Sequence, residues 1–283
     1  MDKPLSLSAW SWMCLALLVL TLLVLRENTL AADGALHVHT LDVGQGDSIL
    51  LVTPSGKQIL VDGGPDLSTL EHVGKYFPYL DRKIELLVMT HPDADHLTAL
   101  PAIVERYDID HVMISGIDKA QPRYQAMLDS ITKRRISVIF PDPAEDIVMG
   151  DGVVLDVIAP ESGVLGKKVT DSNNSSVVLR VLYGEDSLLL TGDIEEEAEY
   201  DILASGADLH SRILKAAHHG SKTSSATGFL LATHPELVLV SSGSGNSFGH
   251  PHAEVTERYS LYGIPYRNTA LEGTISLRMT GKN

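Results

Sequence analysis

The stretch Thr90-His91-Pro92-Asp93-Ala94-Asp95-His96 decides the fold of this chain. It places two imidazoles and two carboxylates directly after the apolar run at residues 84–89. An ionised side chain at the end of a buried strand is costly unless a partner offsets its desolvation. Four such groups in one loop therefore predict a divalent metal site at a strand end. Histidine and aspartate are ligands that zinc, manganese and iron all accept, so the motif predicts a metal without specifying which one.

The composition describes a globular, acidic chain. Its 283 residues permit one large domain or two small ones, and 44% apolar residues suffice for a substantial core. The formal charge of −15 lies almost wholly after Ala32, because the charges before that residue cancel. Such a surface repels nucleic acid on average, so a nuclease activity would need metal and a local basic patch.

Residues 5–25 form an apolar run that predicts an N-terminal hydrophobic helix and membrane association. The run is near the ~20 residues that span a bilayer, yet Thr29-x-Ala31 resembles a signal-peptide cleavage site. Residues 1–32 are therefore expected to be a signal peptide or a membrane anchor. Either one places the following domain on the outer face of the cytoplasmic membrane, periplasmic or secreted. The one cysteine, Cys14, lies inside this run, so the domain has no disulfide and no thiol ligand.

Apolar runs after Ala35 predict a β-rich domain over residues 35–283. The expected strands cover residues 36–43, 48–53, 58–61, 84–89, 110–115, 137–140, 153–158, 176–182, 187–191, 212–217 and 236–241, with two more pieces between 266 and 279. The expected helices cover residues 67–79, 96–106, 124–135, 194–204 and 254–262. The pattern restarts at Asp151 without a linker, which predicts two sheet-and-helix halves facing each other in one α/β domain.

Two more groups of ionisable side chains follow apolar strands in the second half. Asp193 follows the run at 188–190, and His218 and His219 follow the run at 212–217. Successive side chains of a strand face opposite ways. One of the two imidazoles is therefore expected to bind metal, while the other contacts substrate or protonates a leaving group. The pattern leaves open which of them does which.

A glycine-rich loop at residues 243–252 follows the next strand. Backbone amides in such a loop can hold a phosphate oxygen, and His250 or His252 can donate a proton. Lys215 and Lys222 flank the twin histidines in the sequence and are expected to contact phosphate. The acidic residues 195–199 are expected to form a solvated first helical turn, which the helix dipole favours.

These motifs resemble those of a known family. HPDADH resembles the HxHxDH signature of the metallo-β-lactamase superfamily, with Asp93 where most members have a second histidine. The chain also has LDVGQGDS at 41–48, LVDGG at 60–64, LLTGD at 189–193 and HHGS at 218–221, and so it is similar to the hydrolase-like domain of the ComEC DNA-uptake family. The resemblance covers nearly everything after Ala35 and implies a four-layer αββα sandwich.

The resemblance also implies a site for two divalent ions, zinc or manganese. His91, Asp93 and Asp193 would hold the first ion, and Asp95, His96, Asp193 and one of His218 and His219 would hold the second. Asn173 and Ser176 lie where the superfamily commonly supplies a third histidine, so the first ion is expected to bind weakly and to be a harder metal such as manganese. Asp62 is expected to orient a ligating histidine.

The predicted activity is metal-dependent hydrolysis of an ester, above all a phosphodiester such as DNA. A hydroxide held between the two ions would attack the ester, with Asp95, His250 and His252 as catalytic residues. The residues expected to contact substrate are Gln45, Asn173, Ser176, Lys215, Ser221 and Lys222. Two alternatives stay open. One is hydrolysis of another envelope ester, namely a lactone, a phosphorylcholine ester or, as the weakest candidate, a β-lactam. The other is a non-catalytic domain that binds DNA or a membrane channel.

Overall fold

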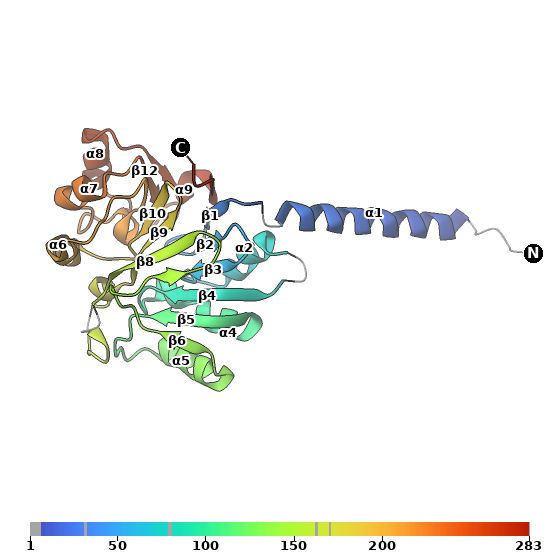
Figure 1. Ribbon diagram of the computed structural model, residues 1–283, viewed down its shortest axis with the longest axis horizontal. Coiled ribbons are helices and arrows are strands. Elements are labelled where there is room, and N and C mark those ends of the chain that lie inside the picture. The colour runs from blue at the N-terminus through green and yellow to red at the C-terminus, as the bar shows by residue number, and fades with distance from the viewer. Residues whose placement is uncertain (1–6, 31–32, 79–80, 162–163, 170, 283) are drawn as a thin grey trace, which may run out of the picture.

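Two seven-stranded sheets form the centre of the protein, which is described here from a computed structural model (Figure 1). The structure describes residues 7–30, 33–78, 81–161, 164–169 and 171–282. Side chains from both sheets share one hydrophobic cluster, so the sheets pack face to face.

Each sheet is antiparallel in one half and parallel in the other. The first sheet has the order β14 (Ile275–Met279), β1 (Leu36–Thr40), β2 (Ile49–Val52), β3 (Gln58–Val61), β4 (Lys83–Met89), β5 (Asp108–Ile114) and β6 (Ser137–Ile139), and its strands are parallel from β3 to β6. The second sheet has the order β13 (Tyr266–Asn268), β12 (Leu237–Val240), β11 (Ile213–Lys215), β10 (Asp186–Leu190), β9 (Val178–Tyr183), β8 (Val153–Ala159) and β7 (Ile147–Val148), and its strands are parallel from β10 to β13. Only β14, among the strands described, joins the sheet of the other half of the chain.

Helices cover the outer face of each sheet. The helices α2 (Ser68–Tyr76), α3 (Ala94–Leu97), α4 (Leu100–Arg106) and α5 (Pro122–Arg134) pack on the first sheet, and α6 (Glu196–Ser205), α7 (Thr227–Thr233) and α8 (Ala253–Leu261) pack on the second. The described residues thus form three apolar clusters, one between the sheets and one under each helical layer. This arrangement confirms the predicted four-layer αββα sandwich.

Strand β4 explains why the apolar runs in the sequence lack polar alternation. Leu87 and Met89 point into the cluster under the helices, whereas Leu86 and Val88 point into the cluster between the sheets. A strand that is covered on both faces buries every side chain. The run therefore predicts a strand at the centre of a layered fold, and it delivers the loop that begins at Thr90 to the edge of the sheet.

Most element boundaries differ from the prediction by a few residues. The predicted helix 96–106 consists of two helices, α3 and α4, and the predicted end of helix 67–79 at Tyr79 lies outside the described residues. Strand β7 and helix α7 were not predicted. Helix α7 is short, and Gly228 lowers its intrinsic helix propensity. It forms because Phe229 and Leu230 pack into the cluster under the helices of the second sheet.

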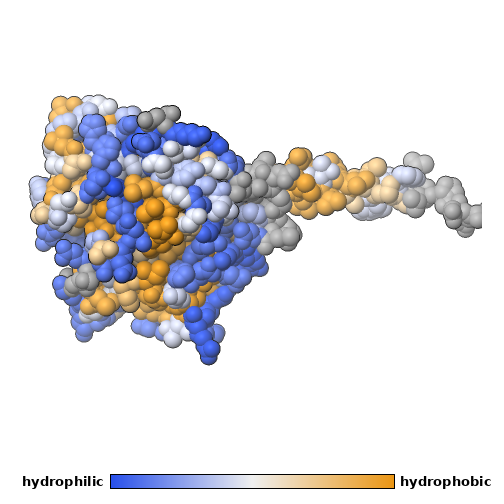
Figure 2. Space-filling view, viewed as in Figure 1, coloured by the Kyte–Doolittle hydropathy of each residue, from blue (hydrophilic) through white to orange (hydrophobic). Residues whose placement is uncertain are grey.

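The helix α1 (Leu7–Leu30) extends away from the sheets (Figure 1), and much of its visible surface is hydrophobic (Figure 2). The window Ser8–Leu25 has a mean hydropathy of 2.2, and none of it is buried against the protein. By length and composition this helix can cross a membrane. The proposed cleavage site ends at Ala31, which lies outside the described residues, so cleavage stays a prediction.

Glu199 of α6 contradicts the expectation that residues 195–199 are all solvated. Its side chain is 0% exposed and accepts hydrogen bonds from the backbone N–H groups of Ser225 and Ala226, at 2.6 and 2.7 Å. Burial raises the pKa of Glu199 to about 7, although these two hydrogen bonds oppose the shift. The carboxyl group thus anchors the loop between the twin histidines and α7.

Because the folded-state pKa of Glu199 lies above its ordinary value of 4.5, its contribution to stability is complete below pH 4.5 and is lost as the pH rises through about 7. We expect Glu199→Gln to remove this dependence. The free energy of unfolding of the wild type relative to the variant should fall by on the order of 3 kcal/mol between acidic and weakly alkaline pH. Urea unfolding across this range measures the difference, and Glu197→Gln on the exposed side of the same helix is the control. A difference that does not change with pH would contradict the assignment.

Candidate metal centre

The candidate site lies where both sheets present the carboxyl ends of parallel strands. Asp62 follows β3, and the loop at residues 90–96, called the metal loop below, follows β4. In the second sheet, Asp193 follows β10, and His219 lies in the turn η3 (Ala217–Gly220) after β11. Strands β3 and β4 are parallel neighbours, as are β10 and β11, so these segments meet at one edge. The fold thereby brings together side chains that are far apart in the sequence.

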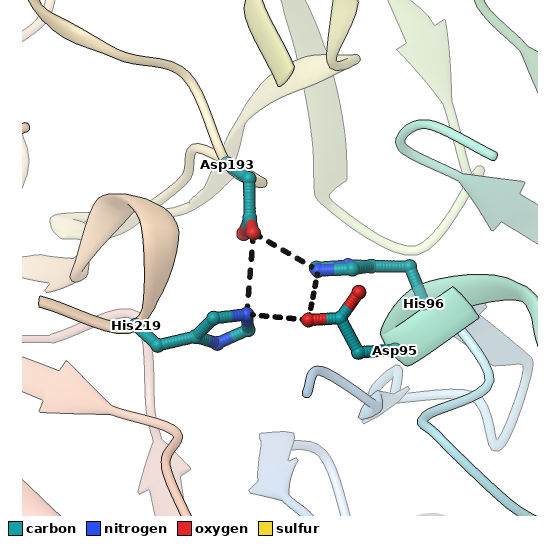
Figure 3. Close-up of side chains that lie close together, drawn as sticks. All are labelled: Asp95, His96, Asp193 and His219. Atoms are coloured by element: carbon teal, nitrogen blue, oxygen red, sulfur yellow. Dashed lines mark ion pairs between the residues drawn. The ribbon is translucent and has the colours of Figure 1, made fainter. Parts of the chain in front are cut away.

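Four side chains point toward one another at this edge (Figure 3). Asp95, His96, Asp193 and His219 each offer one ligand atom, and these atoms all lie within 4.8 Å of one another. The Nε2 atoms of His96 and His219 each lie 3.2 Å from Asp193 Oδ2, and His219 Nε2 lies 3.3 Å from Asp95 Oδ2. Three of these side chains are almost fully buried, and Asp95 is the one that reaches the surface.

The hydrogen bonding at this site fits a bound divalent cation. His96 Nε2, His219 Nε2 and Asp193 Oδ1 are buried and have no hydrogen-bond partner, even though opposite charges are close by. Buried polar atoms without a partner are rare because their desolvation is not offset. Two imidazole nitrogens and two carboxylates form a donor set that zinc and manganese both accept. These four residues can therefore hold one metal ion.

The pKa shifts of His96, His219 and Asp193 also show that positive charge is favoured at this site. Burial alone would lower the pKa values of His96 and His219, but the charge of Asp193, with Asp62 near His96 and Asp47 near His219, raises both well above the ordinary value. Burial alone would likewise raise the pKa of Asp193, but attraction to the two imidazoles holds it well below its usual range. A divalent cation would supply this positive charge without protons on the ligand nitrogens.

Asp62 joins β3 to the metal loop. Its backbone adopts a left-handed conformation with φ of 64°, and its Oδ1 accepts the Thr90 N–H at 2.8 Å. Its Oδ2 accepts the Thr90 hydroxyl at 2.7 Å and lies 2.8 Å from His96 Nδ1. A proton held on Nδ1 leaves Nε2 of His96 free to bind metal. The position of Asp62 is the one that its predicted orienting role requires.

Asp47 is a charged residue of this site that we did not assign from the sequence. It is buried, its Oδ1 lies 3.3 Å from His219 Nδ1, and its Oδ2 pairs with Lys215 Nζ at 2.7 Å. The side chain of Lys215 is 1% exposed. The prediction that Lys215 contacts phosphate is therefore wrong. The apolar sheet around Lys215 keeps its ammonium away from solvent, and the ammonium neutralises Asp47 instead.

Gly46 in the Gly44-Gln45-Gly46-Asp47 loop is explained by close backbone packing. Gly46 has φ of +146°, and a Cβ there would lie 2.2 Å from the carbonyl oxygen of Asp95. The N–H of Asp47 donates to that same carbonyl at 3.2 Å. A side chain at Gly46 would push the metal loop away. The contact between Gly46 and the carbonyl of Asp95 therefore helps to fix the position of Asp95.

The structure distinguishes the two adjacent histidines. His219 belongs to the four-residue cluster, and its Nδ1 lies 3.0 Å from the carbonyl oxygen of Ser241. His218 is 23% exposed, its Nδ1 lies 3.1 Å from Glu195, and its Nε2 lies 3.9 Å from Asp193 Oδ2, farther than the 3.2 Å of His219. Both have positive φ in η3 and neither is part of a strand, so the expected strand alternation is wrong. The left-handed residues of the turn direct the two rings to different neighbours, and the assignment of one ring to metal and the other to substrate stays a prediction.

The residues expected to bind a first ion do not assemble into a second cluster. Asp93 Oδ1 accepts hydrogen bonds from Lys119 and Ser172, and no group of three or more candidate ligands among the described residues includes His91 or Asp93. Burial alone would raise the pKa of Asp93, but these two hydrogen bonds lower it. His91 Nε2 is buried without a partner. Of the three residues expected to hold the first ion, Asp93 is already paired and Asp193 belongs to the four-residue cluster, so the number of ions stays a prediction.

Ser176, Asn173 and Ser221 were predicted to contact substrate. Ser176 is 1% exposed, and its hydroxyl donates to the Asn173 carbonyl and accepts the N–H of Asp193. Ser221 is also buried, and its hydroxyl lies 2.9 Å from that of Thr223. The predictions for the two serines are therefore wrong, because both hydroxyls are used to hold loops in place. The half-buried side chain of Asn173 stays a candidate.

The remaining candidates line the outer side of the cluster. The His250 ring centroid lies 5.5 Å from that of His218 and 4.8 Å from that of His252. Gln45 connects the two halves here, since its Nε2 lies 3.3 Å from His250 Nδ1 and its Oε1 accepts the Gly243 N–H. Lys222 is exposed, and its backbone N–H donates to His252 Nδ1 at 3.0 Å. These residues stay candidates for substrate contact and proton transfer.

Residues 41–242 match the family described as the metallo-beta-lactamase superfamily, which is more than half of the chain. The chain therefore belongs to the metallo-β-lactamase superfamily. Members of this superfamily typically bind divalent metals, often zinc, and the Asp95, His96, Asp193 and His219 cluster provides candidate ligands.

Within this superfamily the chain is related to competence proteins. It is 27% identical over 269 residues to ComE operon protein 3 of Bacillus subtilis (strain 168), with 88% of this chain and 33% of that protein aligned. It is 29% identical over 280 residues to competence protein ComA of Neisseria gonorrhoeae, with 97% and 36% aligned. It is 30% identical over 248 residues to recombination protein 2 of Haemophilus influenzae, with 84% and 28% aligned. The chain thus spans about a third of the length of these relatives, and the predicted ComEC-like resemblance is confirmed.

Solved structures support the fold. The metallo-β-lactamase fold protein YhfI from Bacillus subtilis superposes with a TM-score of 0.57 at 14% identity, over 86% of this chain and 99% of that one. A putative metal-dependent hydrolase from Parabacteroides distasonis gives a TM-score of 0.50 at 14% identity, over 85% and 96%.

The two adjacent histidines give a matched test of the cluster. We expect His219→Ala to weaken zinc or manganese binding by at least about a hundredfold, because it removes a ligand atom. His218→Ala should change the affinity by no more than a few-fold, since that ring pairs with Glu195. Isothermal titration calorimetry of the metal-free protein measures both. An affinity of His219→Ala equal to that of the wild type would show that the ion is bound elsewhere.

Asp62→Asn tests the support of His96. Asparagine tolerates the left-handed backbone at this position, but it removes the negative charge that faces His96 Nδ1. We expect metal affinity to fall by about 10–100-fold while the circular dichroism spectrum is unchanged. An affinity equal to that of the wild type would exclude an orienting role for Asp62.

Proposed function

We propose that residues 35–283 form a metal-dependent phosphodiesterase or nuclease whose centre is the Asp95, His96, Asp193 and His219 cluster. The observation that carries this proposal is the set of buried, unpartnered ligand atoms that come from both sheets. A purely binding domain has no need for such a set, because its desolvation would weaken the fold. The residues that hold the ion come from both halves of the chain, so hydrolysis depends on the intact domain.

An ion bound by these residues would polarise an ester oxygen and make a water molecule more acidic. Asp193 lies between both imidazoles and is the ligand that joins the two sheets. Asp95 reaches the surface and therefore lies on the side from which a substrate arrives. The chain's own contribution is to hold these groups in place before substrate binds.

The outer histidines, His250 and His252, can form hydrogen bonds with the substrate and with the leaving group. His252 Nδ1 accepts the Lys222 N–H, so the ring proton of His252 resides on Nε2, where it can donate a hydrogen bond to a leaving oxygen. Burial, with the nearby His219 and His218 rings, lowers the pKa of His250 to about 4. A neutral His250 near pH 7 is a hydrogen-bond partner for substrate and adds no charge.

A phosphodiester substrate suits the local charges. The overall charge of −15 repels a polyanion, but Lys119 and Lys222 both lie near the site. The names of the relatives, competence protein ComA and recombination protein 2, point to DNA. We therefore favour DNA over a lactone, a phosphorylcholine ester or a β-lactam.

We further propose that residues 1–32 direct the domain to the outer face of the cytoplasmic membrane, as an anchor or as a cleaved signal. An apolar helix of this length that packs on no part of the described protein favours a lipid environment or removal by cleavage. The absence of cysteine after residue 32 is compatible with either.

Asp193→Asn tests the proposed activity. It keeps the size of the side chain but removes the charge that both histidines face. We expect turnover of bis-nitrophenyl phosphate and single-stranded DNA with zinc or manganese to fall by at least about a hundredfold, which corresponds to roughly 3 kcal/mol of transition-state stabilisation. Asp201→Asn, an exposed carboxylate of α6, is the matched control.

A parallel screen with a lactone and a β-lactam separates the possible ester classes. Unchanged turnover in Asp193→Asn would exclude this site as the catalytic centre. Wild-type protein that binds DNA but cleaves none of these substrates at any metal concentration would favour the non-catalytic alternative.

A further inference from the structure

Lys119 lies on the side of the site where a first ion was expected. It comes from the loop between β5 and α5, a part of the sequence without a metal-binding motif. Its Nζ donates to Asp93 Oδ1 and to the Ser172 hydroxyl, the latter at 2.7 Å, and Ser172 in turn donates to Asp93. Lys119, Ser172 and the carboxylate of Asp93 come from three separate loops, and each of them is hydrogen-bonded to the other two.

This network is built into the fold. Ser172 is 0% exposed, whereas Lys119 keeps 21% and Asp93 keeps 33% of their side-chain surface. The backbone on both sides of Lys119 is also held, because Asp118 forms a β-bridge with Lys168 and the N–H of Gln121 donates to the carbonyl of Lys119. The ammonium is therefore fixed beside Asp93 and stays at the edge of the solvent-accessible site.

The other donors expected around a first ion are also engaged, with one exception. The hydroxyl of Ser176, which lies where the third histidine was expected, bonds to Asn173 and to the N–H of Asp193. Among the described residues expected to hold a first ion, His91 Nε2 and Asp193 Oδ1 are left without a partner, and Asp193 already belongs to the four-residue cluster. A tight site for zinc or manganese needs three or four ligand atoms, so this side lacks them.

A second group of acidic and histidine residues does not supply the missing ligand atoms either. Asp47, Asp62 and His96 lie close together, but Asp62 bonds to Thr90 and His96, and Asp47 pairs with Lys215. These ligand atoms serve the support of the four-residue cluster. The described part of the chain thus offers one set of ligands that is not already satisfied.

We propose that the site binds one divalent ion tightly and that the Lys119 ammonium takes the place of a second ion beside Asp93. A divalent cation next to this ammonium would be repelled by it, and Asp93 cannot serve both at once. The anionic group of the substrate would then lie between one metal ion and one ammonium, with Lys119 as a substrate-positioning residue. This inference rests on the proposed function, because it assumes that the four-residue cluster holds the single ion.

Metal stoichiometry tests the proposal directly. Full-length protein is purified, stripped with chelator, loaded with manganese and freed of excess metal, and the bound metal is then measured by inductively coupled plasma mass spectrometry. We expect one ion per chain for the wild type, and none for Asp193→Asn. Electron paramagnetic resonance should show the six-line signal of isolated Mn(II), without the coupling of a two-ion centre.

Lys119→Met frees Asp93 while keeping the length of the side chain. We expect the variant to take up a second manganese ion with an affinity at least about tenfold above that of the wild type, measured by calorimetry. Lys75→Met, an exposed lysine of α2, is the matched control and should keep the wild-type stoichiometry. Lys119→Arg should also stay at one ion, because the charge is retained. Thermal unfolding of each variant confirms that the domain is folded.

The outcomes separate this proposal from the proposed function. If the wild type holds two tight ions and Asp93→Asn reduces them to one, the role of Lys119 is excluded while the hydrolase proposal stands. If Lys119→Met binds no additional ion under any condition, the proposal that the Lys119 ammonium takes the place of a second ion is likewise excluded. If the wild type binds no ion at all, both proposals fail.

Discussion

The structure depends on the neutralisation of carboxylates that both sheets place at one edge. Asp193 meets the rings of His96 and His219, Asp47 meets Lys215, and Asp93 meets Lys119. A buried charge without a partner would lower the stability of a small domain by more than the domain can lose. Each of these carboxylates therefore has a lysine or histidine partner. The four-residue cluster is the place where protein groups alone leave ligand atoms unsatisfied. That difference marks it as the candidate metal site.

The layered fold makes such a cluster possible. Parallel strands end together, and two sheets packed face to face bring two such edges to the same side of the molecule. Backbone contacts then set the distances. Gly46 lets one loop touch the carbonyl of Asp95, and Gly192, with φ of +52°, packs against Ser176 and Thr90, so Asp193 reaches across to the other sheet. Small residues at these contacts are therefore as necessary to the site as the ligands themselves.

The two lysines near the site have different consequences for function. Lys215 is sealed between the sheet and Asp47, so it stabilises the support of His219 and cannot meet a substrate. Lys119 stays partly exposed, so its charge is available to an anionic ligand. An acidic protein that acts on a phosphodiester needs such local cations, because its average field is unfavourable.

Much of the fold could be predicted from the sequence, because continuous apolar runs such as residues 84–89 and 188–190 are typical of strands covered on both faces. The carboxylates and histidines that follow these runs also identified the residues that form the four-residue cluster. Other features could not be predicted, since they depend on where distant loops meet. The separation of His218 from His219 follows from left-handed turn residues, and the burial of Glu199 and Lys215 follows from packing against other segments. Lys119 has no local signal at all. The sequence by itself determined which residues can bind metal, and the tertiary structure decided which carboxylates are already neutralised, because electrostatic compensation depends on distances in space.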